Sequence, residues 1–237
     1  MPRAAGSGST RMWRRGSAST SGHRAKRDDG VAMSEEQTVF VVDDDAGMRE
    51  SMTLMLEQAG FHVRAFANAQ AFLDTCGTEE LGCLVLDLRM PGMSGLDLQR
   101  TLTQLGYSLP IIFLSAFGDV PATVRAIKGG AADFLEKPVS MGVLIGRIRQ
   151  ALEEDRERRG RAAEFLRLRT LFDQLTPRER EVMELATSGM ANKVIASSLG
   201  ISPRTVENHR ARVMEKLEVR NIAELCQVAA VCLSSGE

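Results

Sequence analysis

The sequence predicts an α/β domain with a five-stranded, doubly wound parallel sheet, followed by an all-α domain. From Thr38 onward, short apolar segments alternate with helix-like segments, a pattern typical of a parallel sheet covered by helices on both faces. From Thr176 onward, only short helix-like segments follow. Strands are expected near residues 39–42, 61–66, 83–88, 111–115 and 134–135, and the helices near 48–58, 69–73, 96–105, 121–127 and 143–152.

Length and composition limit the class of protein. With 237 residues and 43% hydrophobic content, the chain can form two domains with packed cores. The formal net charge of -1 excludes a global basic field for nucleic acid. No apolar run approaches the ~18 residues of a membrane span, so we expect a soluble, cytoplasmic protein without a membrane partner. The cysteines form no CxxC pair and are interpreted as buried or incidental thiols in a reducing compartment.

Composition also divides the chain into segments. Residues 1–36 are rich in Gly, Ser, Ala and Arg, and we expect a disordered basic tail or an unused upstream start, since Met33 directly precedes the ordered pattern. A transit peptide or a nucleic-acid-binding arm are alternatives for this segment. The α/β domain is expected at 37–152, a charged helical linker at 153–171, and the all-α domain at 172–237.

Polar side chains follow four of the predicted strands. They are, in chain order, Asp43–Asp45, Asp87, Ser115 and Lys137. Because function gathers at the carboxyl ends of parallel strands, we expect these side chains to converge at one edge of the sheet. Clustered carboxylates repel each other unless a hard cation such as Mg²⁺ joins them. A carboxylate beside such an ion can attack a phosphoryl group, while the metal, a hydroxyl and an ammonium neutralise its charge.

Four stretches resemble the receiver domain of two-component response regulators over about residues 38–152: VVDDD (41–45), LVLDLRMPGMSGLDL (84–98), IIFLSAFGD (111–119) and DFLEKP (133–138). The resemblance implies a flavodoxin-like receiver fold, with Asp87 as the phosphoacceptor and a sensor histidine kinase as the partner. It further implies that Asp43 and Asp44 are the acidic pair of the Mg²⁺ site. Asp44, Asp87 and the Arg89 carbonyl would be the direct ligands. Ser115 would be the switch hydroxyl, Lys137 the phosphate-binding lysine, and Phe134 the switch aromatic.

The C-terminal segment carries the signals of a helix-turn-helix. Thr176, Pro177 and Glu179 form an N-cap, a first-turn proline and a capping box. A second helix is expected at 192–199, and a third follows the cap Ser202. Two short helices joined by a Gly-containing turn indicate a helix-turn-helix. Basic residues gather around the third helix: Lys193, Arg204, Arg210, Arg212, Lys216 and Arg220.

The stretch SPRTVENHRARVMEKL (202–217) resembles the LuxR/GerE-type helix-turn-helix of the NarL/FixJ class, in particular the FixJ type, and the similarity spans about residues 172–233. The resemblance implies that the third helix enters the major groove of promoter DNA. Glu207, Asn208 and Ala211 would then face base edges. The residues near phosphates would be Lys193, Thr205, His209 and Arg212, and Arg204 is also assigned to the DNA-binding surface.

Together the two resemblances predict a phosphorylation-dependent transcriptional regulator, with an activator acting with RNA polymerase as the expected role. The FixJ type also implies a homodimer when phosphorylated, with Val124 and Lys128 on the dimer face. No enzymatic reaction is expected beyond the receiver's own phosphorylation and dephosphorylation. A DNA-binding regulator with a vestigial, non-phosphorylated receiver is the alternative. A haloacid-type phosphatase is disfavoured because it would carry its nucleophile after the first strand.

Overall fold

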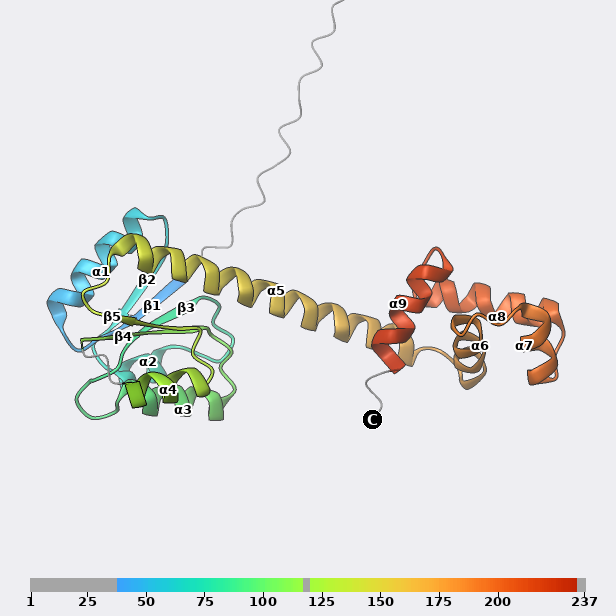
Figure 1. Cartoon of the computed structure of the whole chain (residues 1–237), viewed down its shortest axis with the longest axis horizontal. Helices are drawn as coiled ribbons and strands as arrows, with labels where there is room; N and C mark the ends of the chain where they lie inside the picture. Colours follow the sequence, from blue (N-terminus) through green and yellow to red (C-terminus); the bar gives the residue numbers. More distant parts are fainter. Residues whose placement is uncertain (1–37, 117–119, 234–237) are drawn as a thin grey trace, which may run out of the picture. The chain divides into compact units, whose positions relative to one another are not determined.

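The computed structural model describes residues 38–116 and 120–233 (Figure 1), so the expectations for residues 1–36 lie outside the described part. A parallel sheet with the order β2-β1-β3-β4-β5 forms the N-terminal domain, which confirms the predicted fold class. The strands are β1 (Thr38–Val42), β2 (His62–Phe66), β3 (Cys83–Asp87), β4 (Ile111–Ser115) and β5 (Asp133–Glu136). The helices that follow them are α1 (Ala46–Gln58), α2 (Ala69–Thr75), α3 (Gly95–Leu105), α4 (Val120–Lys128) and α5 (Met141–Asp173).

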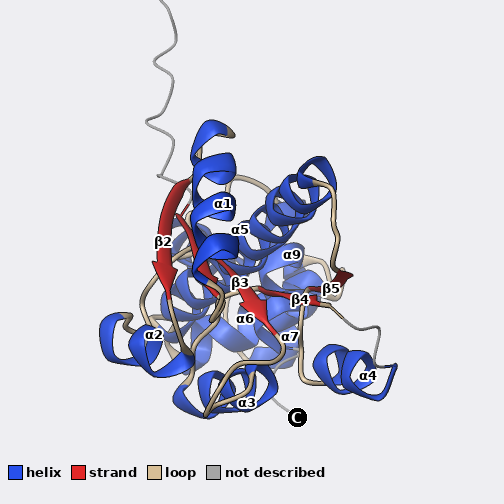
Figure 2. Cartoon of the chain, turned by 90° about the vertical axis from the view of Figure 1, so that its left-hand side faces the viewer, coloured by secondary structure: helices blue, strands red, loops and turns tan. Residues whose placement is uncertain are grey.

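The central strands are apolar because helices cover both faces of the sheet (Figure 2). Alternate residues of a strand point to opposite faces. In β1, Phe40 and Val42 pack with α2, α3 and α4, whereas Val39 and Val41 pack with α1 and α5. The same alternation holds in β3 and β4. The buried strands therefore leave polar side chains only at their ends.

Helix α5 is longer than the sequence indicated. The expected last helix of the α/β domain and the expected linker form one helix, Met141–Asp173. Beyond its apolar contacts with the sheet, α5 buries Asp155, whose carboxylate pairs with Arg158 and with Arg159 at 2.8 Å. Arg158 also donates a hydrogen bond of 2.7 Å to the carbonyl oxygen of Ser108, before β4. The first turns of the charged segment are thus attached to the α/β domain, and the domain limits at 152 and 172 stay predictions.

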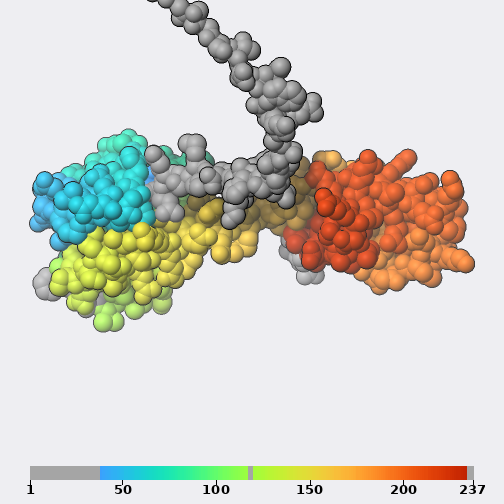
Figure 3. Space-filling view, turned by 90° about the horizontal axis from the view of Figure 1, so that it is seen from above, coloured from blue at the N-terminus to red at the C-terminus, as the bar shows by residue number. Residues whose placement is uncertain are grey.

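The C-terminal domain contains α6 (Pro177–Thr187), α7 (Asn192–Leu199), α8 (Pro203–Lys216) and α9 (Ile222–Leu233). Figure 3 shows these helices, coloured orange to red, in close packing. Gly200 ends α7 in the left-handed region, at φ 65°, and Ser202 caps α8. Helices α6, α7 and α8 share one small core, which includes Val182, Ile195 and Val206, while Met183 and Val213 pack in a second cluster with α5 and α9. The helix-turn-helix therefore rests on a helix packed behind it. Across residues 38–116 and 120–233, no helix has the length and apolar content of a membrane span.

A buried ion pair joins α6 to α8. The capping box predicted at Thr176 and Glu179 is present, and the Glu179 carboxylate also accepts a hydrogen bond of 2.7 Å from the Lys216 ammonium. Burial would raise the pKa of Glu179, but the bonds from Lys216 and Thr176 outweigh it and lower the pKa to about 2. Glu179 is only 3% exposed, so its charge depends on these partners.

Replacing Glu179 by Gln should remove an acid-sensitive part of this domain's stability. Because the pKa is depressed in the folded state, the stabilisation is fully present above the ordinary pKa of 4.5 and is lost as the pH falls toward about 2. At neutral pH the loss should reach up to about 3 kcal/mol, at about 1.4 kcal/mol per pKa unit. Urea unfolding at neutral and acid pH, followed by the amide NMR signals of α6 and α8, measures it.

Glu181→Gln is the matched control for this prediction. Glu181 lies on the same helix and pairs with Arg178 at 2.7 Å, but its side chain is half exposed. Exposed pairs contribute about 0–1 kcal/mol. Equal losses in the two variants would contradict the role assigned to the buried pair.

Candidate functional site

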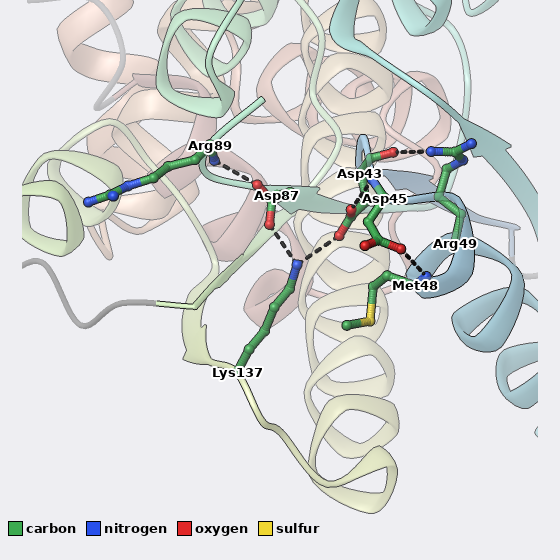
Figure 4. Close-up of polar contacts among 7 residues, drawn as sticks. All are labelled: Asp43, Asp45, Met48, Arg49, Asp87, Arg89 and Lys137. Carbon is green, nitrogen blue, oxygen red and sulfur yellow. Dashed lines mark hydrogen bonds and ion pairs between the residues drawn. The ribbon is translucent and has the colours of Figure 1, made fainter. Parts of the chain in front are cut away.

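Two buried carboxylates and one ammonium meet at the carboxyl edge of the sheet (Figure 4). Asp43 directly follows β1, Asp87 is the last residue of β3, and Lys137 directly follows β5. The Lys137 Nζ atom lies 2.7 Å from Asp43 Oδ2 and 2.6 Å from Asp87 Oδ1. The structure thus brings Lys137 together with Asp43 and Asp87, which lie 94 and 50 positions before it in the sequence.

The ammonium is held in its charged form by this arrangement. Burial lowers the pKa of Lys137, but hydrogen bonds to Asp43 and Asp87 and their negative charges outweigh burial, so that the pKa is raised above its ordinary value. A carboxylate without a partner is costly to bury. Lys137 therefore supplies the partner that both buried carboxylates need.

Backbone groups fix the orientation of both carboxylates. The Arg89 N–H donates a hydrogen bond of 2.7 Å to Asp87 Oδ2, and the Asp45 N–H donates one of 2.9 Å to Asp43 Oδ1. Each buried carboxylate is thus held by one N–H group and one ammonium hydrogen bond. Asp44 differs, because its side chain is exposed and makes no hydrogen bond or ion pair within the described ranges.

Asp45 has a structural role that the sequence analysis did not assign. Its carboxylate accepts a hydrogen bond of 2.8 Å from the Met48 N–H and caps α1. The signal was available, since Asp before a helical pattern is a preferred N-cap. Asp45 is consequently engaged at the helix start, which leaves Asp43 and Asp44 as the predicted acidic pair.

The two predicted switch residues lie on neighbouring strands. Ser115 ends β4 and is 2% exposed. Phe134 lies on β5, and its ring stacks on Phe113 with centroids 6.2 Å apart and an interplanar angle of 29°. The hydroxyl is therefore on the strand beside Asp87, and the aromatic ring is one strand further along the sheet.

The donor chemistry of this edge suits Mg²⁺. No group of three or more His, Cys, Asp or Glu side chains in metal-binding geometry occurs among the residues that the structure describes. Mg²⁺ does not require one, because it usually takes one or two carboxylates and keeps several waters. Asp43, Asp44 and Asp87 offer only hard oxygen donors, and the site already accommodates a positive charge between two of them. The residues present thus fit Mg²⁺ better than a softer ion.

Helix α8 presents a polar face to solvent. The exposed side chains on it include Glu207, Asn208 and Ala211, which were expected at base edges, and Arg204 and Arg212; Lys193 is exposed on α7. Val206 and Val213 face the core, which orients the helix. Thr205 and His209 are only partly exposed. The Thr205 hydroxyl lies 2.8 Å from the Ser202 hydroxyl at the helix cap. A phosphate that contacts Thr205 would therefore have to share this hydroxyl with Ser202.

Two basic residues counted with this surface are engaged inside the domain. Arg210 donates a hydrogen bond of 2.7 Å to the Asn192 side chain at the start of α7, and Lys216 binds Glu179. The basic character of the face therefore comes from fewer residues than the sequence suggested. Arg210 joins the two helices of the helix-turn-helix, and no local sequence signal indicates this bond.

Comparison with known proteins identifies both domains. The family described as "Response regulator receiver domain" matches residues 39–149, and "Bacterial regulatory proteins, luxR family" matches residues 173–229. Nodulation protein W of Bradyrhizobium diazoefficiens is 43% identical over 196 residues, which are 83% of this chain and 86% of that protein. Transcriptional regulatory protein FixJ of Azorhizobium caulinodans is 43% identical over 197 residues, 83% of this chain and 93% of that protein.

Solved structures agree with these relatives. The response regulator StyR has a TM-score of 0.74 at 46% identity and covers 82% of this chain and 98% of its own. Full-length FixJ from B. japonicum has a TM-score of 0.55 at 39% identity and covers 84% of this chain and 98% of its own. The resemblances seen in the sequence are thereby confirmed. The chain belongs to the two-component response regulators, as a transcription regulator with a receiver domain and a LuxR-type DNA-binding domain.

Proposed function

We propose that this regulator is switched by phosphorylation of Asp87. In this proposal a sensor histidine kinase donates the phosphoryl group with Mg²⁺ present, and the phosphorylated protein dimerises, binds promoter DNA in the cytoplasm and activates transcription with RNA polymerase. One observation carries the proposal: Lys137 bridges Asp87 and Asp43 at the carboxyl edge of the sheet. A charged, oriented carboxylate beside a fixed ammonium is what phosphoryl transfer requires.

The chemical step is a displacement at phosphorus. An oxygen of the Asp87 carboxylate attacks the phosphoryl group of a phosphohistidine, the P–N bond breaks, and the imidazole leaves with the bonding electrons. Lys137, already 2.6 Å from Asp87 Oδ1, is close enough to donate to a phosphoryl oxygen. Asp44, Asp87 and the Arg89 carbonyl would hold Mg²⁺, which when bound offsets the negative charge of the phosphoryl oxygens. Ser115, on the neighbouring strand, would donate its hydroxyl to the same group.

The switch would act through α4 and β5. Helix α4 buries only two small side chains, Ala122 and Ala126, so that its displacement costs few contacts. Movement of Ser115 and Phe134 toward the phosphoryl group would bias the position of α4. Val124 is 45% exposed on this helix and Lys128 is also exposed, as a dimer face requires.

The DNA-binding step would use α8. A symmetric dimer would present two such helices to half-sites about one helical turn, ~10 bp, apart. Asn208 can pair with adenine and Glu207 can accept from cytosine in the major groove. Exposed Lys193, Arg204 and Arg212 would contact phosphates. A vestigial receiver is the less favoured alternative, because Asp43, Asp44, Asp87, Ser115 and Lys137 are all in place.

Asp87→Asn should abolish phosphorylation and leave the fold intact, since it removes the anionic nucleophile but keeps the side-chain shape. Lys137 would retain Asp43 as its partner. Intact mass after incubation with a small phosphodonor and Mg²⁺ should show one added phosphoryl group on the wild type and none on the variant. The exposed Asp74, on α2, provides the control Asp74→Asn, which should react normally. Equal phosphorylation of Asp87→Asn and the wild type would refute the assignment.

Arg212→Gln should weaken binding to all DNA sequences and reduce the slope of log K against log salt by about 1, since a phosphate contact is lost. Arg210→Gln should leave the slope unchanged and lower stability by about 1 kcal/mol, because it breaks the bond to Asn192. Fluorescence anisotropy at several salt concentrations and urea unfolding separate the two effects. A reduced salt slope in Arg210→Gln, equal to that in Arg212→Gln, would place both arginines on DNA.

Phosphorylation should drive dimerisation, and Val124→Asp should block it by placing a charge on the α4 face. The control is Val143→Asp on α5, because Val143 is 49% exposed against 45% for Val124 and receives the same charge. Analytical ultracentrifugation with and without phosphodonor measures the dimer fraction. A wild type that stays monomeric when phosphorylated, yet gains full operator affinity, would show relief of an intramolecular block instead.

A further inference from the structure

We propose that Arg49 is a positioning residue for the metal site. Its guanidinium fixes the peptide group between Asp43 and Asp44 and so presents the Asp44 carboxylate to Mg²⁺. This inference rests on the proposed function, since it concerns the ion that the phosphoryl transfer requires.

Arg49 satisfies a backbone carbonyl at the end of β1. The strand ends at Val42, and the Asp43 N–H still donates to the Phe66 carbonyl oxygen of β2 at 3.3 Å. No backbone N–H of the described residues donates to the Asp43 carbonyl oxygen. Arg49, one turn into α1, donates to it through Nη1 at 2.7 Å (Figure 4). Because Asp43 is 2% exposed, its carbonyl needs such a partner.

This bond matters most for Asp44. The Asp43 side chain is held independently by Lys137 and by the Asp45 N–H. The Asp44 side chain makes no hydrogen bond or ion pair with any described residue, so its position is set through its backbone. The peptide group is planar, and a hydrogen bond to the carbonyl oxygen of Asp43 therefore fixes the amide that begins Asp44. Arg49 supplies the side-chain bond to that peptide.

Two effects of Arg49 on Mg²⁺ binding oppose each other. Its positive charge repels the cation, and its removal would then tighten binding. Its hydrogen bond orients a ligand, and its removal would then weaken binding. Arg49 is partly exposed, so water and salt screen its charge, whereas the orientation of a ligand is not screened. Groups that orient metal ligands commonly change metal affinity 10–100-fold when they are removed. We therefore expect orientation to dominate.

The test is a Mg²⁺ titration of the full chain, followed by the amide NMR signals of residues 43–47 and 87–89. Arg49→Met should weaken Mg²⁺ binding roughly tenfold. Arg49→Lys should recover most of the affinity, because an ammonium can also donate to the carbonyl. Arg149→Met is the matched control: Arg149 also donates to a backbone carbonyl, that of Ala59 at 3.3 Å, and the variant should bind Mg²⁺ as the wild type does.

Unchanged or tighter Mg²⁺ binding by Arg49→Met would overturn the inference. Tighter binding would mean that the charge of Arg49 repels the cation more than its hydrogen bond helps, and unchanged binding would mean that Arg49 has no net effect. If urea unfolding shows that Arg49→Met is not folded, Arg49→Leu, which also lacks a donor, replaces it with the same expected loss. Asp44→Asn tests the Mg²⁺ site itself separately from the positioning role of Arg49. Loss of binding in Asp44→Asn together with normal binding in Arg49→Met refutes only the role of Arg49. A wild type that does not bind Mg²⁺ refutes both.

Discussion

The ammonium of Lys137 is the constraint on which the receiver site depends. It joins Asp43 and Asp87, at 2.7 and 2.6 Å, at an edge where both carboxylates are largely buried. Desolvation of a lone carboxylate would cost several kcal/mol, and two lone carboxylates would also repel each other. The ammonium lies between them and pairs with both, and each carboxylate keeps one oxygen on a backbone N–H. Any event that adds charge at Asp87 must therefore redistribute the bonds of Lys137.

The parallel sheet makes this three-residue contact possible. Asp43 and Asp87 end neighbouring strands, and Lys137 reaches them from β5, across β4. All strands run in the same direction, so their carboxyl ends share one edge. The apolar alternation in β1, β3 and β4 fixes which face each residue takes and so prevents a slip of register. The position of the site thus follows from the packing of residues that take no part in its chemistry.

Patterns that repeat along the chain could be predicted from the sequence, whereas contacts that depend on one side chain could not. The strand–helix alternation, the capping box at Thr176 and the polar strand ends are periodic or local signals. Two such contacts are the hydrogen bonds from Arg49 to the Asp43 carbonyl and from Arg210 to Asn192, each of which joins two different elements. The sequence does not indicate which arginine of a helix makes a bond of this kind. The linker was expected to be helical, but its continuity with the last helix of the α/β domain was not predicted, because a charged segment with few apolar residues carries little helical periodicity.

Helix α5 shows how the two domains share one element. Its first half packs Leu144 and Ile148 against the sheet, and its last turn places Phe172 in the core of the C-terminal helices. Between them, the buried Asp155 carboxylate pairs with the more exposed Arg158 and Arg159, and Arg158 also donates to the Ser108 carbonyl. Breaking one partner of a buried pair leaves an uncompensated charge, which is costly. The first turns of the predicted linker are therefore anchored to the α/β domain, whereas further along the same helix the side chains of residues 160–167 are exposed.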